Sequence, residues 1–166
     1  MILSHSRVLW SATLLLGGLA LPVRAGLDAP AAASVCDLVT RQEAAAALGA
    51  AVPAGTAKNM DLPMVGTTVK MEVCFFGSEV MVARYALGSG APELFSKYRQ
   101  SLAARPAITG YENVTQLGDE AFVAKGQLAI RKGQTGLIVD VGQARGGGPK
   151  ELKAEKALAA LAIGRL

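Results

Sequence analysis

The sequence predicts an α+β fold, in which helices pack on an antiparallel sheet. Residues 120–142 form short segments in which apolar and polar residues alternate, with glycines between them. This pattern is typical of antiparallel strands joined by tight turns. A second pair of alternating segments lies at 69–76 and 80–87. Three segments outside these strands have helical features: 41–48, 91–104 and 150–163. Such segregation of helices from strands favours an α+β domain over βαβ units.

We expect residues 120–142 to form the middle of the sheet. The predicted strands are 120–125, 127–131 and 137–141, separated by glycine-containing turns. Gly133 suits the second turn, because a hairpin loop requires a positive φ that glycine adopts at no steric cost. A helix across this region is disfavoured, since each internal glycine would weaken it by about 1 kcal/mol.

The first predicted helix, 41–48, has signals at both ends. Thr40 and Glu43 have the spacing of a capping box, and Gly49 stands where a left-handed C-cap residue belongs. This spacing favours a capping role for Glu43 over a catalytic one. Prolines and glycines interrupt residues 50–68 repeatedly, so we expect mostly loop there, with a short strand at 51–52 and an exposed loop around 58–61.

The predicted helix 91–104 carries an apolar stripe that includes Phe95 and Tyr98. Such a stripe is typical of a core-facing helix. The alternative is that Phe95 and Tyr98, together with Phe122 of the sheet, line a ligand pocket between helix and sheet.

The strand regions contain three polar site candidates, Arg84, Asp119 and Glu120. Arg84 shares a strand face with Val82, and we expect it on the solvent side of the sheet; contact with a ligand anion is the alternative. Asp119 follows Gly118 and is expected to serve a turn. Neighbours on a strand point to opposite faces, so Asp119 and Glu120 are not expected to form a catalytic pair.

The last predicted helix, 150–163, is amphipathic. Its expected buried stripe is Ala154, Ala157, Leu158, Leu161 and Ala162. Glu155 is expected on the opposite, solvated side. The glycine-rich stretch 143–149 before the helix lacks the Gly-Lys-Ser/Thr ending of a P-loop, so we expect a flexible connection.

The N-terminus predicts export. Residues 8–21 form an apolar run, shorter than the roughly 20 residues of a spanning helix, and small residues precede a cleavage site after Ala25. We therefore expect a signal peptide at 1–25, a flexible leader at 26–35 and one domain at 36–166, with no membrane span after cleavage. The alternative is an uncleaved membrane anchor.

Cleavage would remove the single histidine, His5, and the single tryptophan, Trp10. A Ser-His-Asp or Cys-His nucleophile and a His-ligated metal site would then be excluded, and we expect no metal and no cofactor. Loss of Arg7 and Arg24 leaves 15 of the 17 Lys and Arg against 13 Asp and Glu, a net charge of +2. This balance does not predict nucleic-acid binding.

The two cysteines, Cys36 and Cys74, are expected to form one disulfide in an exported protein. Closure of this loop stabilises the fold by about 4 kcal/mol in the chain-entropy treatment. A redox-active pair is the alternative, but such pairs are usually close in sequence as C-x-x-C.

Several stretches carry a family resemblance: CDLVTRQEAAAALG at 36–49, VCFF at 73–76, the stretch 117–142 and the closing Ala/Leu-rich helix. Together they resemble small secreted bacterial domains of unknown function that are common among actinobacterial lipoproteins. The resemblance covers most of 36–166 and implies a PsbP-like α/β/α sandwich without established catalytic residues. This chain differs in lacking a lipid-attachment cysteine.

These features predict a periplasmic or secreted module that is not an enzyme and binds a protein partner or another envelope component. The alternative is a carrier of a small apolar ligand, and a third candidate is a hydrolase that works without histidine. A deep apolar pocket would favour the carrier, whereas an exposed apolar patch would favour a partner surface.

Overall fold

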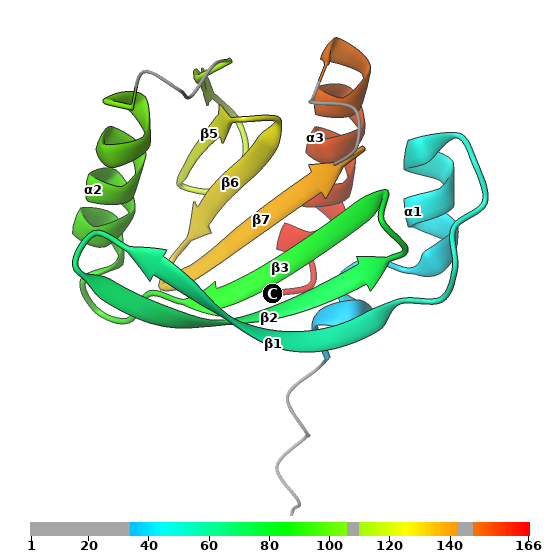
Figure 1. Ribbon diagram of the computed structural model, residues 1–166, viewed down its shortest axis with the longest axis horizontal. Helices are drawn as coiled ribbons and strands as arrows, with labels where there is room; N and C mark the ends of the chain where they lie inside the picture. Colours follow the sequence, from blue (N-terminus) through cyan, green and yellow to red (C-terminus); the bar gives the residue numbers. More distant parts are fainter. Residues whose placement is uncertain (1–33, 106–109, 143–147) are drawn as a thin grey trace, which may run out of the picture. The chain divides into compact units, whose positions relative to one another are not determined.

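Seven antiparallel strands form one sheet in the computed structural model of the chain, in the order β1-β2-β3-β7-β6-β5-β4 (Figure 1). The structure describes residues 34–105, 110–142 and 148–166, which belong to a single compact unit, Ala32–Leu166. The predicted signal peptide and residues 26–33 of the predicted leader lie outside the described residues, as does most of the predicted connection at 143–149.

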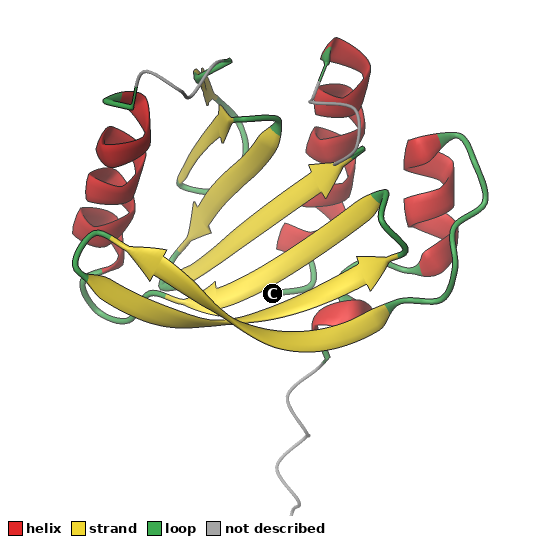
Figure 2. Ribbon diagram, in the orientation of Figure 1, coloured by secondary structure: helices red, strands yellow, loops and turns green. Residues whose placement is uncertain are grey.

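The described elements alternate between hairpins and helices along the chain (Figure 2). The strands are β1 Thr56–Met64, β2 Thr67–Phe76, β3 Val80–Ala86, β4 Glu112–Val114, β5 Glu120–Ala124, β6 Gln127–Lys132 and β7 Thr135–Val141. The helices are the short 3-10 helix η1 Val35–Asp37, then α1 Arg41–Leu48, α2 Ala91–Ala103 and α3 Pro149–Ile163. The predicted helices and the two predicted strand groups are confirmed, with ends that differ by one or two residues.

Helices cover both faces of the sheet. On one face, buried residues such as Val82, Leu128 and Val139 pack with η1, α1 and α3. On the other face, Ile138 and Phe122 pack with α2. Successive residues of a strand enter opposite layers, because side chains alternate along it. The predicted α+β class, an antiparallel sheet with helices packed on it, is confirmed.

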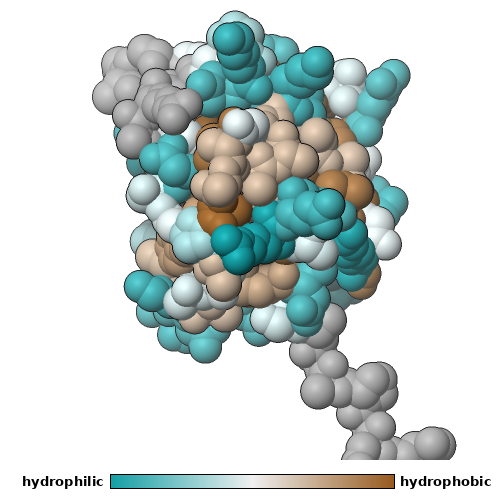
Figure 3. Space-filling view, turned by 90° about the vertical axis from the view of Figure 1, so that its right-hand side faces the viewer, coloured by the Kyte–Doolittle hydropathy of each residue, from teal (hydrophilic) through white to brown (hydrophobic). Residues whose placement is uncertain are grey.

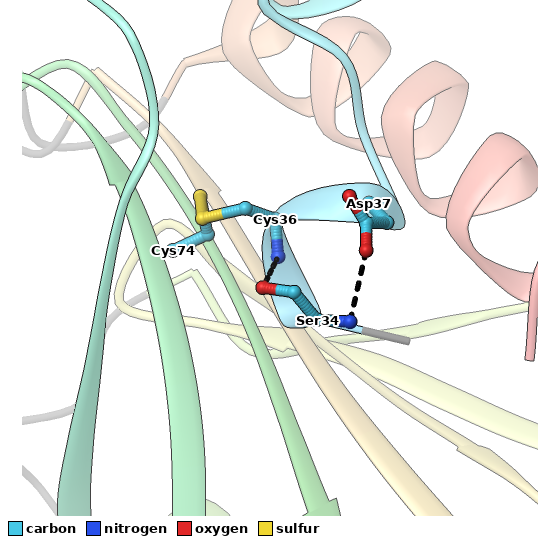
Figure 4. The surroundings of a disulfide bond; sticks show 4 residues. All are labelled: Ser34, Cys36, Asp37 and Cys74. Carbon is cyan, nitrogen blue, oxygen red and sulfur yellow. Dashed lines mark hydrogen bonds between the residues drawn. A yellow bond between two sulfur atoms is a disulfide. The ribbon is translucent and has the colours of Figure 1, made fainter. Parts of the chain in front are cut away.

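The predicted disulfide is confirmed and joins η1 to β2. Cys36 and Cys74 are bonded at 2.04 Å, and Cys74 is fully buried (Figure 4). Ser34 accepts a hydrogen bond from the Cys36 amide, and the Ser34 amide donates to Asp37, so the short helix is capped at its start. Gly55 lies against the bond, since a Cβ there would be 2.6 Å from the Cys74 sulfur.

The capping box of α1 is confirmed and has a further partner. The Thr40 amide donates to the Glu43 carboxylate at 2.8 Å, and the helix ends at Gly49 with a φ of 72°. The guanidinium of Arg165 also binds this carboxylate, at 2.6 Å. Hydrogen bonds from Arg165 and from the Thr40 amide lower the pKa of Glu43 to about 2. One side chain therefore caps α1 and ties it to the end of α3.

Two predictions for residues 50–68 are wrong. The loop expected at 58–61 is part of strand β1, which pairs with β2 along its whole length, from Thr56 opposite Phe75 to Met64 opposite Thr67. No strand forms at 51–52. At the end of the predicted leader, Ser34 caps η1 and Val35 is buried.

The predicted buried stripe of α3 is displaced around the helix. Ala157 and Leu161 are exposed, whereas Ala159 and Glu155 are buried, with Glu155 only 1 % exposed. Glu155 accepts a hydrogen bond from the Val141 amide at 3.1 Å. The pairing of β6 with β7 reaches Asp140, the residue before Val141. The Val141 amide therefore has no acceptor on β6 and needs another one.

Burial raises the pKa of Glu155 to about 8, and the nearby carboxylates of Asp140 and Glu151 act in the same direction. The folded pKa thus lies above the ordinary value of 4.5. The contribution of Glu155 to stability is therefore fully present below pH 4.5 and is lost as the pH rises through about 8.

Disulfide reduction should destabilise the domain. The bond closes a loop with a sequence separation of 38 residues, for which chain entropy gives about 4 kcal/mol. We expect reductant to lower the melting temperature by roughly 10 °C or more in scanning calorimetry. A Cys36→Ala/Cys74→Ala variant should melt at a similarly lowered temperature, and reductant should not change that temperature. Equal melting curves with and without reductant would contradict this role.

Glu155→Gln should stabilise the protein selectively at high pH. The amide keeps an acceptor for the Val141 amide but never ionises, so the variant escapes the loss that the wild type suffers between pH 5 and pH 8. Urea denaturation across this range should show the two curves converging toward acid and separating toward alkali. Parallel curves would show that Glu155 does not titrate in this window.

Candidate binding groove

An open groove of about 760 Å³ lies at one end of the sheet. We call this cavity the groove; its lining residues are Asn59, Lys70, Met71, Glu72, Arg84, Tyr85, Ala86, Thr135 and Leu166. These residues belong to strands β1, β2, β3 and β7, except for Leu166, which lies three residues after the end of α3. This volume is within the range of small-molecule and peptide pockets.

The groove is the part of one sheet face that the helices leave uncovered. Glu72 lies two residues from Cys74 and therefore on the same face as the disulfide, η1 and α3. Arg84 likewise shares the face of Val82. Arg84 lies on the open part of this face, with its side chain 22 % exposed, and helices bury the same face at its other end.

Cross-strand ion pairs line the groove. Arg84 pairs with Glu72, its direct neighbour on β2. Lys70 pairs with Asp61 of β1 at 2.6 Å, with the Lys70 side chain 87 % exposed. Asn59 lies opposite Glu72 and continues this polar row to the edge of the sheet. The groove thus offers donors and acceptors of both signs and suits a polar or mixed-charge ligand, such as an extended polypeptide.

The hairpin β1–β2 is also exposed on its other face. Met60 is 45 % exposed, and Val65 in the turn is 47 % exposed. Lys58 lies over the ring of Phe75, 5.7 Å from its centre. Met60 lies opposite Met71 and so belongs to the face that α2 covers farther along the sheet. The outermost strand therefore has an accessible apolar side chain on the sheet face opposite the groove.

The predicted ligand-pocket residues pack against one another. Phe122 lies 5.4 Å from Phe95 and 6.0 Å from Tyr98, measured between ring centroids, and Tyr111 stacks on it at 5.8 Å. Phe95 and Phe122 are fully buried. The structure brings the three predicted residues together as a packed aromatic cluster, and none of them lines the groove.

Asp119 serves a turn, as the sequence predicts. Its carboxylate accepts from the Gly133 amide at 2.7 Å and from Arg131 at 2.9 Å. The Gly133 hydrogen bond is the main cause that lowers the pKa of Asp119, with Arg131 nearby acting in the same direction. Glu120 reaches the same guanidinium at 3.1 Å, because Asp119 precedes strand β5 and Glu120 begins it. Arg131, which is 9 % exposed, therefore holds the two carboxylates in a structural cluster.

The side of the molecule that α1 occupies offers a weaker surface feature. Figure 3 faces this side and shows a weakly hydrophobic tan area framed by hydrophilic teal. Helix α1 and the loop after it expose small residues, Ala46, Ala50, Ala51 and Ala54. The large exposed apolar side chains among the described residues are Met60, Val65, Leu161 and Leu166, and two of the four lie on the β1–β2 hairpin.

Comparison of the chain with protein-family models, with curated proteins and with solved structures gives no match. In the part of the chain that the structure describes, no helix is long and apolar enough to cross a membrane. Within the same residues, no three His, Cys, Asp or Glu side chains are grouped as metal ligands.

Most groove residues escape sequence analysis because they belong to the unrecognised strand β1 or meet only in the folded sheet. The signal that could have found them lies in β2, where Lys70 and Glu72 stand on the same face as the buried Cys74. Charged residues at two successive positions of an otherwise buried face mark the place where the helical cover ends.

Arg131 and Lys70 should differ sharply in their structural importance. Arg131→Ala leaves two carboxylates without their buried partner and should lower the free energy of unfolding by about 3 kcal/mol. Lys70→Ala removes an exposed pair and should change it by less than about 0.5 kcal/mol. Urea denaturation at neutral pH measures both. A small loss for Arg131→Ala would contradict its structural role, whereas a large loss for Lys70→Ala would mean that the groove is part of the structural framework.

Proposed function

We propose that this protein is an exported, non-enzymatic module that binds a protein partner, or another component of the cell envelope, through the groove and the adjoining strand β1. The observation that carries the proposal is the open, mixed-charge groove beside an exposed edge strand. The charged and polar side chains along the groove would orient and select an extended polypeptide, and this binding does not use the backbone edge of β1.

The lining of the groove favours a polypeptide over a small apolar ligand. Ion pairs and an amide stand along it, whereas the aromatic side chains of the α2 layer are occupied with one another. Leu166, which lines the groove and is 47 % exposed, supplies accessible apolar surface next to the polar row. Protein interfaces commonly combine an apolar contact with a polar rim in this way.

Export is proposed from the predicted signal peptide at 1–25 and is supported by the disulfide, since such bonds persist in oxidising compartments. We therefore place the protein in the periplasm or outside the cell. The resemblance to small secreted domains with a PsbP-like sandwich is kept as a proposal, and helices on both faces of an antiparallel sheet agree with it.

In-cell cross-linking followed by affinity capture of the exported protein tests the proposal. Wild type should capture one dominant envelope protein, identified by mass spectrometry. Lys70→Glu should lose most of this capture, because it places a carboxylate beside Asp61 and Glu72 and reverses the charge on the groove rim.

Lys97→Glu provides the matched control. Lys97 forms a similarly exposed pair with Glu93 at 2.7 Å, but on α2 and away from the groove. This variant should retain capture. Equal capture by Lys70→Glu and wild type would contradict the groove as the binding surface. Stoichiometric lipid in native mass spectra of the purified protein would favour the apolar-ligand carrier instead.

A further inference from the structure

We infer that strand β1 pairs with β1 of a second copy of this chain, which joins the two sheets across a two-fold axis. Strand β1 is an edge strand of nine residues, and its first six are exposed on both faces. The opposite edge, β4, has only three residues. An edge strand presents unpaired backbone N–H and C=O groups along its free side. Of the two sheet edges in the described residues, β1 is therefore the one that can accept a full additional strand.

Symmetry restricts the register. In an antiparallel pair, residues opposite each other project to the same face, whereas neighbours along a strand project to opposite faces. A residue at the two-fold axis must therefore lie opposite its own copy and not opposite a copy of its neighbour. Strand β1 runs from Thr56 to Met64, and its midpoint is Met60. A register centred on Met60 is therefore the one that pairs all nine residues, with Thr56 opposite Met64 of the second copy.

The charges of β1 are compatible with this register. Centring the pair on Lys58 or on Asp61 would place two like charges directly opposite each other, which is destabilising. With Met60 at the centre, Lys58 lies opposite Leu62 of the second copy, and Asp61 lies opposite its Asn59. No like charges face each other in this arrangement, and an amide meets a carboxylate.

Side-chain packing favours this register as well. Two Met60 side chains, each 45 % exposed in the single chain, would meet at the axis on the face away from the groove. The aliphatic stem of Lys58 would cover Leu62 of the second copy beside them. Pro63, which has no backbone N–H, would stand near the end of the pair, where a lost hydrogen bond costs least.

Such pairing would extend the groove. Asn59 lines the groove, and Asp61 lies on the same sheet face. Asp61 of the second copy would come opposite Asn59, so the second chain would supply a wall at the open side. A symmetric dimer would then present two grooves on one continuous sheet face.

Light scattering during size-exclusion chromatography of the exported, signal-cleaved protein gives the first test. We expect the mass of two chains at micromolar concentration. Met60→Lys should convert the protein to one chain, because it places two ammonium groups at the axis, and its circular dichroism spectrum should match that of the wild type because Met60 is exposed.

Cysteine cross-linking tests the register. Met60→Cys places two thiols opposite each other, within the Cα separation that a disulfide tolerates, and should form a covalent dimer on mild oxidation. Val65→Cys is the matched control, since Val65 is equally exposed, at 47 %, but does not face itself. A mixture of Lys58→Cys and Leu62→Cys should also cross-link, more than either variant alone.

The wild type eluting as a single chain at high micromolar concentration would overturn the inference. Cross-linking of Met60→Cys no faster than that of Val65→Cys would also overturn it. This inference and the proposed function fail separately: Lys70→Glu changes the groove and leaves the free edge of β1, whereas Met60→Lys changes the other face of the strand. A single chain that still captures an envelope protein would refute the pairing alone.

Discussion

Burial of the central strands on both faces is the constraint on which the rest of this structure depends. All but the first residue of β7 are buried, and its neighbours β3 and β6 are buried along most of their length. A sheet with two apolar faces needs a helical layer on each side. Helix α2 supplies one layer, and η1, α1 and α3 supply the other. The placement of every helix follows from this requirement.

The same constraint locates the groove. Apolar residues continue along each strand as far as a helix covers them, and charged residues begin where the cover ends. On β2 the change occurs between Cys74, which is fully buried, and Glu72, which pairs with Arg84. The groove is thus the end of the helical layer, and its polar character follows from its exposure to water.

Sequence reasoning succeeded where periodicity or capping carries a clear signal. The alternation in β2, β3 and β5 to β7, the Thr40–Glu43 box and the cysteine pair were all sufficient. It failed for β1, because a strand exposed on both faces has no apolar periodicity and is held by pairing with β2. It failed for Glu155 because alanine is common on both sides of α3 and leaves the buried face ambiguous. The groove combines both difficulties, since one wall is β1 and the other residues meet only in the folded sheet.

The ion pair between Arg165 and Glu43 joins parts of the chain that are 122 residues apart in sequence. Helix α1 is among the first elements to be synthesised, yet its ion-pair partner follows the last helix. Loop closure over this distance must precede the contact, which slows its formation. During synthesis, the layer that contains α1 is therefore complete only after almost the whole domain has emerged. The face of the sheet that carries α1 and α3 is therefore closed only when Arg165 is free to reach Glu43.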